Sequence, residues 1–342
     1  MVHENQHREV QYHAYGTPEV LKMVSVDNQE PDDNEVRINI EAVGLNPLEA
    51  KTFGGDARLR IVEFVNRLRR PSLWFGRGPT KFPRGVARDF AGVIDAVGPN
   101  VTNVAIGDAV LGTLYGAPGT IMTGSLTQKL VAPVSDIVPK PDNLSFETAA
   151  TLGVAAQTAY GTFHRLNVGK GDVIIISAAS GGVGSLAVQL AVHLGATVIG
   201  IASERNSDYL RSLGAIPVAY GENLQARIHE AAPAPVTKLF DCYGGDYVKL
   251  GFSLGLSGQD IGTLVPSPLA MIKGAQFTGS RYAQPGDLHE VANLVADGTI
   301  KVTIADEYPF KIESIRQAYN DLGSGHVRGK LVVAPIQVEK SS

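Results

Sequence analysis

The chain has 342 residues, of which 44% are apolar and 19% are charged, with 30 Lys and Arg against 34 Asp and Glu. This length and composition exclude the fibrous and disordered classes and are sufficient for two domains of ordinary size. The formal net charge of -4 gives no general attraction to nucleic acids or to anionic membranes, so we expect small-molecule partners.

Cysteine content and apolar segments bear on the compartment. The chain has one cysteine, Cys242, which excludes an intramolecular disulfide and a four-thiolate zinc site. The first residues form no apolar signal region, and no run reaches the roughly 18 apolar residues that span a bilayer. We therefore expect a cytoplasmic protein that binds neither membrane nor nucleic acid.

Short segments rich in Val and Ile, punctuated by glycine turns, dominate the first part of the chain. Residues 35–43 and 90–97 are examples, and their pattern predicts the strands of a compact barrel-like domain. A proline-rich stretch at 132–145 ends this part, and Ser145 is a candidate N-cap for a helix that follows it.

Residues 56–88 form a basic insert between these strands, with nine Lys and Arg against two Asp and Glu. Apolar residues at helical spacing predict an amphipathic helix, and Trp74 follows it. Two main interpretations stay open: the insert is either a lid that gives a flat acceptor an aromatic surface or a packing helix with a solvated arginine face. Binding of a membrane surface or a nucleic acid by the basic helix is a third, less favoured interpretation.

Strands and helices alternate from about residue 150. The apolar runs 172–177 and 196–202 predict parallel strands, and the residues between them have helical periodicity that ends at Gly195. Residues 238–243 and 262–266 are further strand candidates. This order is typical of a doubly wound α/β domain with a parallel sheet.

The first of these strands runs directly into the glycine-rich loop AASGGVG at 178–184. Aligned on the dinucleotide fingerprint, its three glycine positions hold Ala179, Gly181 and Gly184, so one glycine is missing. A strand before the loop and a helix after it nevertheless favour a pyrophosphate site on the free N–H groups of the helix start. The residues expected to contact the cofactor here are Ser180, Gly181, Gly182 and Val183.

The end of the second strand bears on the choice between NAD and NADP. Ala202 occupies the place where NAD-binding domains carry a ribose-binding carboxylate. Ser203 and Arg205 can bind a 2'-phosphate, and Glu204 is the one discordant residue. The sequence therefore favours NADPH.

Several separated motifs together resemble the zinc-independent quinone oxidoreductase branch of the medium-chain dehydrogenase/reductase superfamily. They are AVGLNPLEAK at 42–51, DFAGVIDAVGPNVTNVAIGDAVLG at 89–112, AASGGVG at 178–184, DCYGG at 241–245 and SGHVRGKLVV at 324–333. The resemblance implies a GroES-like β-barrel catalytic domain formed by residues 1–135 and 287–342. It also implies a Rossmann NADP-binding domain at 136–286 with a doubly wound parallel sheet.

The same resemblance locates the metal-ligand positions of zinc-dependent relatives. Those positions hold Asn46, Arg88 and Val154 in this chain, and none of these side chains is a usual zinc ligand. We therefore expect no metal in the reaction.

The activity implied by the resemblance is NADPH-dependent hydride transfer to quinones or to the double bond of α,β-unsaturated carbonyls. The residues matching the acceptor segment of the family are Asn46 and Lys51, and Lys51 can stabilise a developing oxyanion. Thr158 matches a nicotinamide contact and Tyr220 matches a residue of the adenosine phosphate pocket. The superfamily also leads us to expect a homodimer.

Two other functions remain as alternatives. The first alternative is a non-catalytic NADPH-binding protein of the same fold, since fold does not fix function. The motif GFSLG at 251–255 fits the serine hydrolase pattern around Ser253, but no apolar strand leads into it. Cys242, beside a glycine turn, is interpreted as a core residue rather than a nucleophile.

Overall fold

The protein is described here from a computed structural model. The description covers residues 5–61, 64, 82–115, 123–265 and 267–336. Two compact units divide the chain, the first formed by Met1–Gly153 with Ile304–Ser342 and the second by Val154–Thr303.

The borders of the two units lie later in the chain than the sequence suggested, at 153/154 and 303/304 instead of 135/136 and 286/287. Helix α3 (Phe146–Ala149) explains the first difference, because it packs against strands of the first unit. Helix α10 (Asp287–Ala296) explains the second, because its Glu290 accepts a 2.6 Å hydrogen bond from Tyr160 in helix α4 (Gly153–Leu166).

The first unit is built around strand β3 (Glu35–Leu45), the longest strand among the described residues. Its inward residues alternate with partly exposed ones, and it pairs with β5 (Asp89–Val97), β7 (Lys129–Pro133) and β16 (Lys330–Val333). The described part of this sheet has the order β15-β16-β3-β5-β6-β8, with β7 paired to β3. Its remaining strands are β6 (Ala109–Thr113), β8 (Ile137–Pro139) and β15 (Ile304–Tyr308). The strands expected at 35–43 and 90–97 are thus confirmed as β3 and β5.

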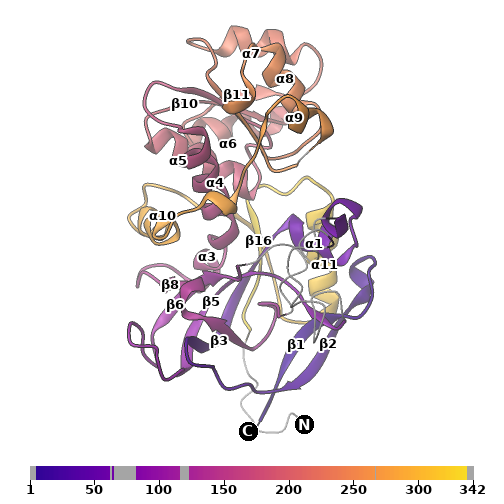
Figure 1. Ribbon diagram of the computed structural model, residues 1–342, viewed down its shortest axis with the longest axis vertical. Coiled ribbons are helices and arrows are strands. Elements are labelled where there is room, and N and C mark those ends of the chain that lie inside the picture. Colours follow the sequence, from indigo (N-terminus) through magenta and orange to yellow (C-terminus); the bar gives the residue numbers. More distant parts are fainter. Residues whose placement is uncertain (1–4, 62–63, 65–81, 116–122, 266, 337–342) are drawn as a thin grey trace. The chain divides into compact units, whose positions relative to one another are not determined.

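A smaller sheet and two helices complete this unit. The described sheet has the order β2-β1-β4, and helices α1 and α11 lie side by side (Figure 1). The bounds of these elements are β1 (Gln6–Tyr12), β2 (Leu21–Asp27), β4 (Arg84–Gly85), α1 (Pro47–Phe53) and α11 (Ile312–Gly323).

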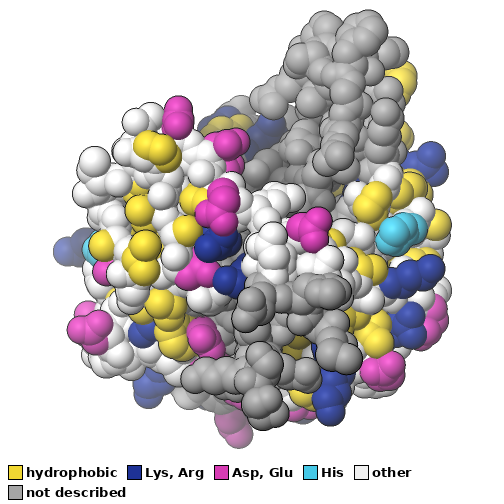
Figure 2. Space-filling model, turned by 90° about the horizontal axis from the view of Figure 1, so that it is seen from below, with side chains coloured by type: hydrophobic (Ala, Val, Ile, Leu, Met, Phe, Trp, Pro, Cys, Tyr) yellow, Lys and Arg dark blue, Asp and Glu magenta, His cyan; other side chains and the backbone are white. Residues whose placement is uncertain are grey.

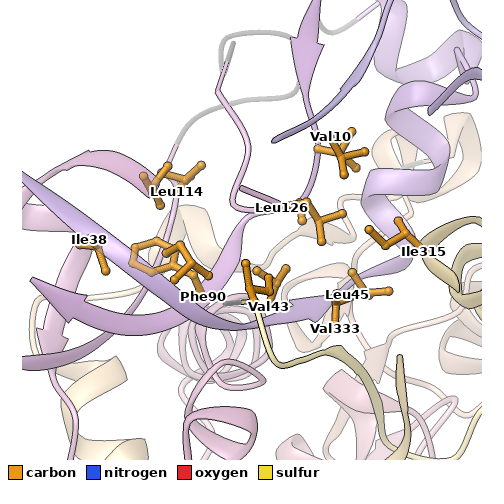
Figure 3. Close-up of a cluster of buried hydrophobic side chains, with 14 of the residues drawn as sticks. Val10, Ile38, Val43, Leu45, Phe90, Leu114, Leu126, Ile315 and Val333 are labelled. Carbon is orange, nitrogen blue, oxygen red and sulfur yellow. The ribbon is translucent and has the colours of Figure 1, made fainter. Parts of the chain in front are cut away.

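The core of the first unit lies between these layers, as Figure 3 shows. Phe90 of β5 and Leu45 of β3 are fully buried there, and Ile315 brings α11 onto the same cluster. Each such large apolar side chain contributes about 1.5–3 kcal/mol when it is removed from water. Residues separated by more than 200 positions in sequence, such as Leu45 and Ile315, therefore share one core.

The second unit contains a parallel sheet with the described order β11-β10-β9-β12-β13-β14. The central strand β9 (Val173–Ile176) is an uninterrupted apolar run and is buried throughout, as parallel sheets with both faces covered require. Its other strands are β10 (Thr197–Ala202), β11 (Ile216–Ala219), β12 (Lys238–Asp241), β13 (Ile261–Thr263) and β14 (Gln276–Phe277).

Helices alternate with these strands, as the sequence predicted. Helix α5 (Gly182–His193) follows β9 and ends before Gly195, which has a φ of +85°. Such a left-handed residue is common directly after a helix. After β10, this unit contains α6 (Ser207–Ser212), α7 (Leu224–Ala231), α8 (Tyr247–Ser253) and α9 (Pro268–Ile272), followed by α10.

The surface in Figure 2 carries Lys and Arg side chains interspersed with Asp and Glu side chains over the described residues. This mixed pattern agrees with the small net charge of the chain. Among the described helices, none is both long enough and apolar enough to cross a membrane.

Most of the basic insert, including Trp74, lies outside the described residues. Residues 57–61 are helical, as expected. Ile61 and Phe64 are 64% and 59% exposed.

Candidate functional site

The glycine loop of the second unit connects the carboxyl end of β9 to the N-terminus of α5. A Cβ added to Gly184 would lie 2.2 Å from the carbonyl oxygen of Ala178, so the packing of the loop requires glycine there. At Gly181 the nearest atom would be 3.4 Å away, which is ordinary contact. The protein's own packing therefore does not require glycine at 181, and the space beside its Cα lets a ligand come close to the loop. The N–H of Gly181 itself donates to the carbonyl of Ala178 at 3.0 Å.

The missing first glycine of the fingerprint is compensated by packing. Ala179 is fully buried, and its N–H donates to the carbonyl of Ile201 at 3.0 Å. A Cβ at Gly200 would come within 3.2 Å of the Ala179 Cβ, so a glycine on β10 provides the room that Ala179 takes. The first N–H groups of α5 have no acceptor within the helix and carry the positive end of its dipole. This part of the loop fits a phosphate anion.

Asn206 joins the glycine loop to the end of β10. Its Nδ2 donates to the hydroxyl oxygens of both Ser180 and Ser203, each at 3.0 Å. Two of the predicted cofactor residues are thereby brought together. Arg205 lies beside them and is exposed in the single helical turn Glu204–Asn206. Asn206 is 7% exposed, and no sequence motif includes this position, so it could not be predicted from the sequence.

The other two predicted cofactor residues lie in different surroundings. Thr158 is buried in α4, where its carbonyl accepts a 2.8 Å hydrogen bond from the hydroxyl of Thr162. Tyr220 follows β11 and is 53% exposed, and its N–H donates to the carbonyl of Ala202 at 3.0 Å. Tyr220 is therefore held at the same edge of the sheet as Ser203.

A buried polar cluster forms the chemically richest part of the first unit. Asn46 begins α1, and its Nδ2 donates to Glu49 Oε1 and to Asp89 Oδ2, both at 3.0 Å. Its Oδ1 accepts from Lys330 Nζ at 2.7 Å, and the same ammonium lies 3.3 Å from Asp89 Oδ2. Tyr319 of α11 donates its hydroxyl to Glu49 Oε2 at 2.9 Å. All five side chains are buried, so this cluster is a prearranged network.

The electrostatics of the cluster follow from its burial. Burial raises the pKa of Glu49 to about 7, and the nearby Asp89 adds to the rise, while Asn46 and Lys330 oppose it. The pKa of Tyr319 also lies well above its ordinary value, first because of burial and then because of the adjacent Glu49. Glu49 therefore carries a proton at a higher pH than an exposed glutamate does.

The two predicted acceptor residues share helix α1 but differ in exposure. Asn46 is 4% exposed, whereas Lys51 is exposed in the last turn of the helix. Glu49 and Arg88 line a pocket of this unit, and burial lowers the pKa of Arg88. The other residues that line this pocket are Tyr12, Thr52, Phe53, Gly85, Val86, Ala87 and Thr123.

Comparisons with known proteins agree with both halves of this architecture. The model of the alcohol dehydrogenase GroES-like domain matches residues 32–142, and the model named zinc-binding dehydrogenase matches residues 182–297. The chain is 31% identical to a chloroplast envelope quinone oxidoreductase homolog of Arabidopsis thaliana, over 95% of this chain and 98% of that protein. The chain belongs to the medium-chain dehydrogenase/reductase superfamily. Its relatives place it in the quinone oxidoreductase branch, and the expected GroES-like and Rossmann fold class is confirmed.

Two further members of the superfamily are informative. The structure of the quinone oxidoreductase from Coxiella burnetii matches with a TM-score of 0.77 and 30% identity, over 96% of this chain and 99% of that one. An Arabidopsis thaliana protein named NADPH-dependent alkenal/one oxidoreductase, chloroplastic, is 29% identical over 95% of this chain and 78% of its own length.

Asn46 stands at one of the positions that hold zinc ligands in some members of the superfamily. Asn46 is engaged by Glu49, Asp89 and Lys330, so its amide is already satisfied within the protein. Within the described ranges, no group of three or more His, Cys, Asp and Glu side chains is arranged to hold a metal ion.

The structure also bears on the two nucleophile candidates. Ser253 ends helix α8, and its hydroxyl donates to the carbonyl of Leu250 at 2.8 Å. Gly251 is inside the same helix, so the strand-to-turn geometry of a nucleophile elbow does not occur there. Burial raises the pKa of the Cys242 thiol well above its ordinary value, which disfavours a reactive thiolate.

Proposed function

We propose that this protein is an NADPH-dependent oxidoreductase that transfers a hydride to quinones or to the double bond of α,β-unsaturated carbonyls without zinc. The observation that carries the proposal is the glycine loop of the second unit. There Gly184 is required by packing, Gly181 leaves space beside its Cα for a ligand, and Asn206 ties this loop to Ser203. The bound nicotinamide would supply the hydride, and the chain's residues bind and orient both reactants.

The cofactor assignment rests on the end of β10. Ser180, Gly181, Gly182 and Val183 surround the helix N-terminus that would hold the pyrophosphate. Ser203 and Arg205 would bind the 2'-phosphate, where an NAD enzyme has a carboxylate. Thr158 and Tyr220 complete the proposed cofactor residues. A relative whose name specifies NADPH supports this choice.

The acceptor chemistry is assigned to the first unit as its catalytic domain. Both N–H bonds of the Asn46 amide are directed at buried carboxylates, so we assign this residue to organising the start of α1. Lys51 is exposed and has an ammonium that can donate to a carbonyl oxygen as negative charge develops. The acceptor classes follow from relatives named for quinones and for alkenals and enones.

The remaining parts of the proposal concern metal, assembly and compartment. Zinc independence rests on Asn46, Arg88 and Val154 at the metal positions. A homodimer is proposed through β14, an edge strand of the parallel sheet that carries the 40% exposed Phe277. The cytoplasm is the proposed compartment because the chain has a single cysteine.

Oxidation of NADPH tests the proposal. The chelated and dialysed protein is mixed with NADPH and either a small quinone or a small enone, and absorbance of NADPH is followed. Turnover with at least one acceptor is expected, at a rate that zinc does not change. Tight NADPH binding with no turnover across both classes would instead favour the non-catalytic alternative.

A further inference from the structure

The helical turn at the start of the basic insert is attached to the first unit by several contacts. Asp56 caps this turn, because its Oδ1 accepts the backbone N–H of Arg58 at 2.9 Å. The N–H of Asp56 donates to the carbonyl of Lys51 in α1 at 3.0 Å. The guanidinium of Arg60 lies 5.4 Å from the ring centre of Tyr15. The first unit therefore fixes where this helical turn begins.

Large apolar side chains of this segment lie in solvent. Ile61 is 64% exposed and Phe64 is 59% exposed, and both residues are helical. They are three positions apart, which is the spacing of neighbours on one face of a helix. A single exposed apolar residue is ordinary, but two at this spacing give a surface that gains free energy on leaving water.

Cations accompany these apolar residues. Residues 56–70 contain five arginines against one Asp and one Glu, and Arg58 and Arg60 are exposed. The net charge of the whole chain is -4, and on that basis we expected no membrane binding. Charges act over only about 8 Å at physiological ionic strength, so a local basic segment can bind an anionic surface that the whole chain does not attract.

Exposed apolar side chains next to arginines fit the surface of an anionic bilayer. The arginines contact lipid phosphates there, while the apolar side chains enter the boundary between headgroups and acyl chains. A nucleic acid would pair with the arginines but would leave Ile61 in water. A second copy of this chain would bring the same arginines together across a two-fold axis, which is unfavourable. The observations therefore favour a lipid surface.

We propose that Arg58, Arg60, Ile61 and Phe64 form a docking surface for anionic membranes, which we call the insert face. The binding is peripheral and reversible, because one short segment buries little apolar area and needs its cations as a second contribution. This inference does not rest on the proposed function, since it concerns a surface of the first unit and requires neither NADPH nor an acceptor.

Flotation of the full chain with lipid vesicles tests the inference. Mixed vesicles of phosphatidylcholine and phosphatidylglycerol should carry the protein, and vesicles of phosphatidylcholine alone should carry roughly tenfold less, because they lack the surface charge that attracts arginine. Raising NaCl to about 1 M, where charges act over only about 3 Å, should release the protein from the mixed vesicles.

Two variants locate the surface, each with a matched control. The double variant Ile61→Ser, Phe64→Ser should weaken binding to mixed vesicles by about tenfold or more, because no large apolar side chain enters the bilayer. Arg58→Gln should weaken it about fivefold. The controls are Ile106→Ser, at a 65% exposed isoleucine of the same unit, and Arg211→Gln, at an exposed arginine of the second unit. Both controls should bind as the wild type does. All the changed side chains are exposed, so these variants should fold, and thermal unfolding checks this.

Four results would overturn the inference. Absence of binding, or equal binding to neutral and mixed vesicles, would exclude recognition of anionic lipid. Wild-type vesicle binding by the double serine variant would show that a different surface binds. Retention of duplex DNA that Arg58→Gln reduces, without vesicle binding, would assign the insert face to a nucleic acid. Self-association in sedimentation that the double serine variant abolishes, again without vesicle binding, would assign it to a second copy of the chain.

Discussion

The glycine-loop edge of the second unit and the polar cluster of the first unit are assembled from residues at different sequence separations. The loop offers backbone N–H groups and small hydroxyl side chains within 30 residues of one another, from Ser177 to Asn206. The cluster brings Asn46, Glu49, Asp89, Tyr319 and Lys330 together from positions up to 284 residues apart. A site made of neighbouring residues depends on local turns, whereas a site made of distant residues depends on the whole core.

Charge is the second difference between these regions. The loop has an uncharged backbone that can bind an anion, while in the cluster the ammonium of Lys330 pairs with the buried carboxylate of Asp89, beside the buried Glu49. Because a buried ion pair is costly to break, changes in the cluster should affect stability, and changes at the loop edge should affect ligand binding.

Removal of the cluster's cation should have the largest effect. Lys330→Met keeps the volume of the side chain but takes the ammonium away from Asp89, and we expect a loss of about 3–5 kcal/mol in the free energy of unfolding. Chemical denaturation measures it. The control is Lys129→Met, because Asp95 keeps its 2.8 Å bond to Arg37 and the loss should be smaller. Equal losses of unfolding free energy in the two variants would contradict the prediction that the Lys330–Asp89 pair matters more to stability than the Lys129–Asp95 pair.

The second largest effect should be the contribution of Glu49 to the pH dependence of the free energy of unfolding. Its folded pKa of about 7 exceeds its ordinary value of 4.5, so the folded state holds the proton more tightly between these values. The stabilisation is therefore present below pH 4.5 and is lost as pH rises through 7, by about 3 kcal/mol. Glu49→Gln should flatten this slope, and Glu307→Gln at an exposed position should not. Parallel pH slopes in wild type and Glu49→Gln would refute the assignment.

At the glycine-loop edge, the expected effect is on the preference for NADPH over NADH. Arg205→Ala should reduce the preference for NADPH over NADH by roughly ten- to a hundredfold, about 1.5–3 kcal/mol, because the 2'-phosphate loses charge-assisted hydrogen bonds. Titration of each cofactor measures the ratio. Arg211→Ala removes another exposed arginine, which pairs with Asp208, and should leave the ratio unchanged. The same ratio of NADPH to NADH affinity in the wild type, Arg205→Ala and Arg211→Ala would exclude a role for Arg205.

The smallest predicted effect lies at the surface of the first unit. Lys51→Met should lower the rate of enone reduction by about tenfold, or about 1.4 kcal/mol, with NADPH affinity nearly unchanged. Quinones should respond less because they are more electrophilic. Lys22→Met, at another exposed lysine of this unit, is the control for a general charge effect. Wild-type enone kinetics in Lys51→Met would contradict the oxyanion role.

The same difference between local and distant residues decides which features could be predicted from the sequence. Strand β9, the glycine loop and α5 were predictable because apolar runs and glycine spacing are local signals. Asn206 was missed because it belongs to no motif, although it joins Ser180 to Ser203. Only tertiary packing revealed that Lys330 reaches Asn46, since no periodicity links positions so far apart.

The borders of the units show the same limit. The compact units divide at 153/154, beyond the proline-rich stretch, because α3 packs on strands of the first unit. Packing of a short helix depends on partners that are distant in sequence, which composition does not reveal.

Transfer of deuterium from 4-deuterated NADPH to a small enone, in chelated protein, tests the central claim most directly. We predict that mass spectrometry of the reduced product finds one deuterium when the stereoisomer matching the transferred position is used, at a rate that added zinc leaves unchanged. Two results would contradict metal-free hydride transfer by this protein. One is that neither NADPH stereoisomer gives a labelled product and a quinone is also left unreduced. The other is a rate that is restored only by zinc.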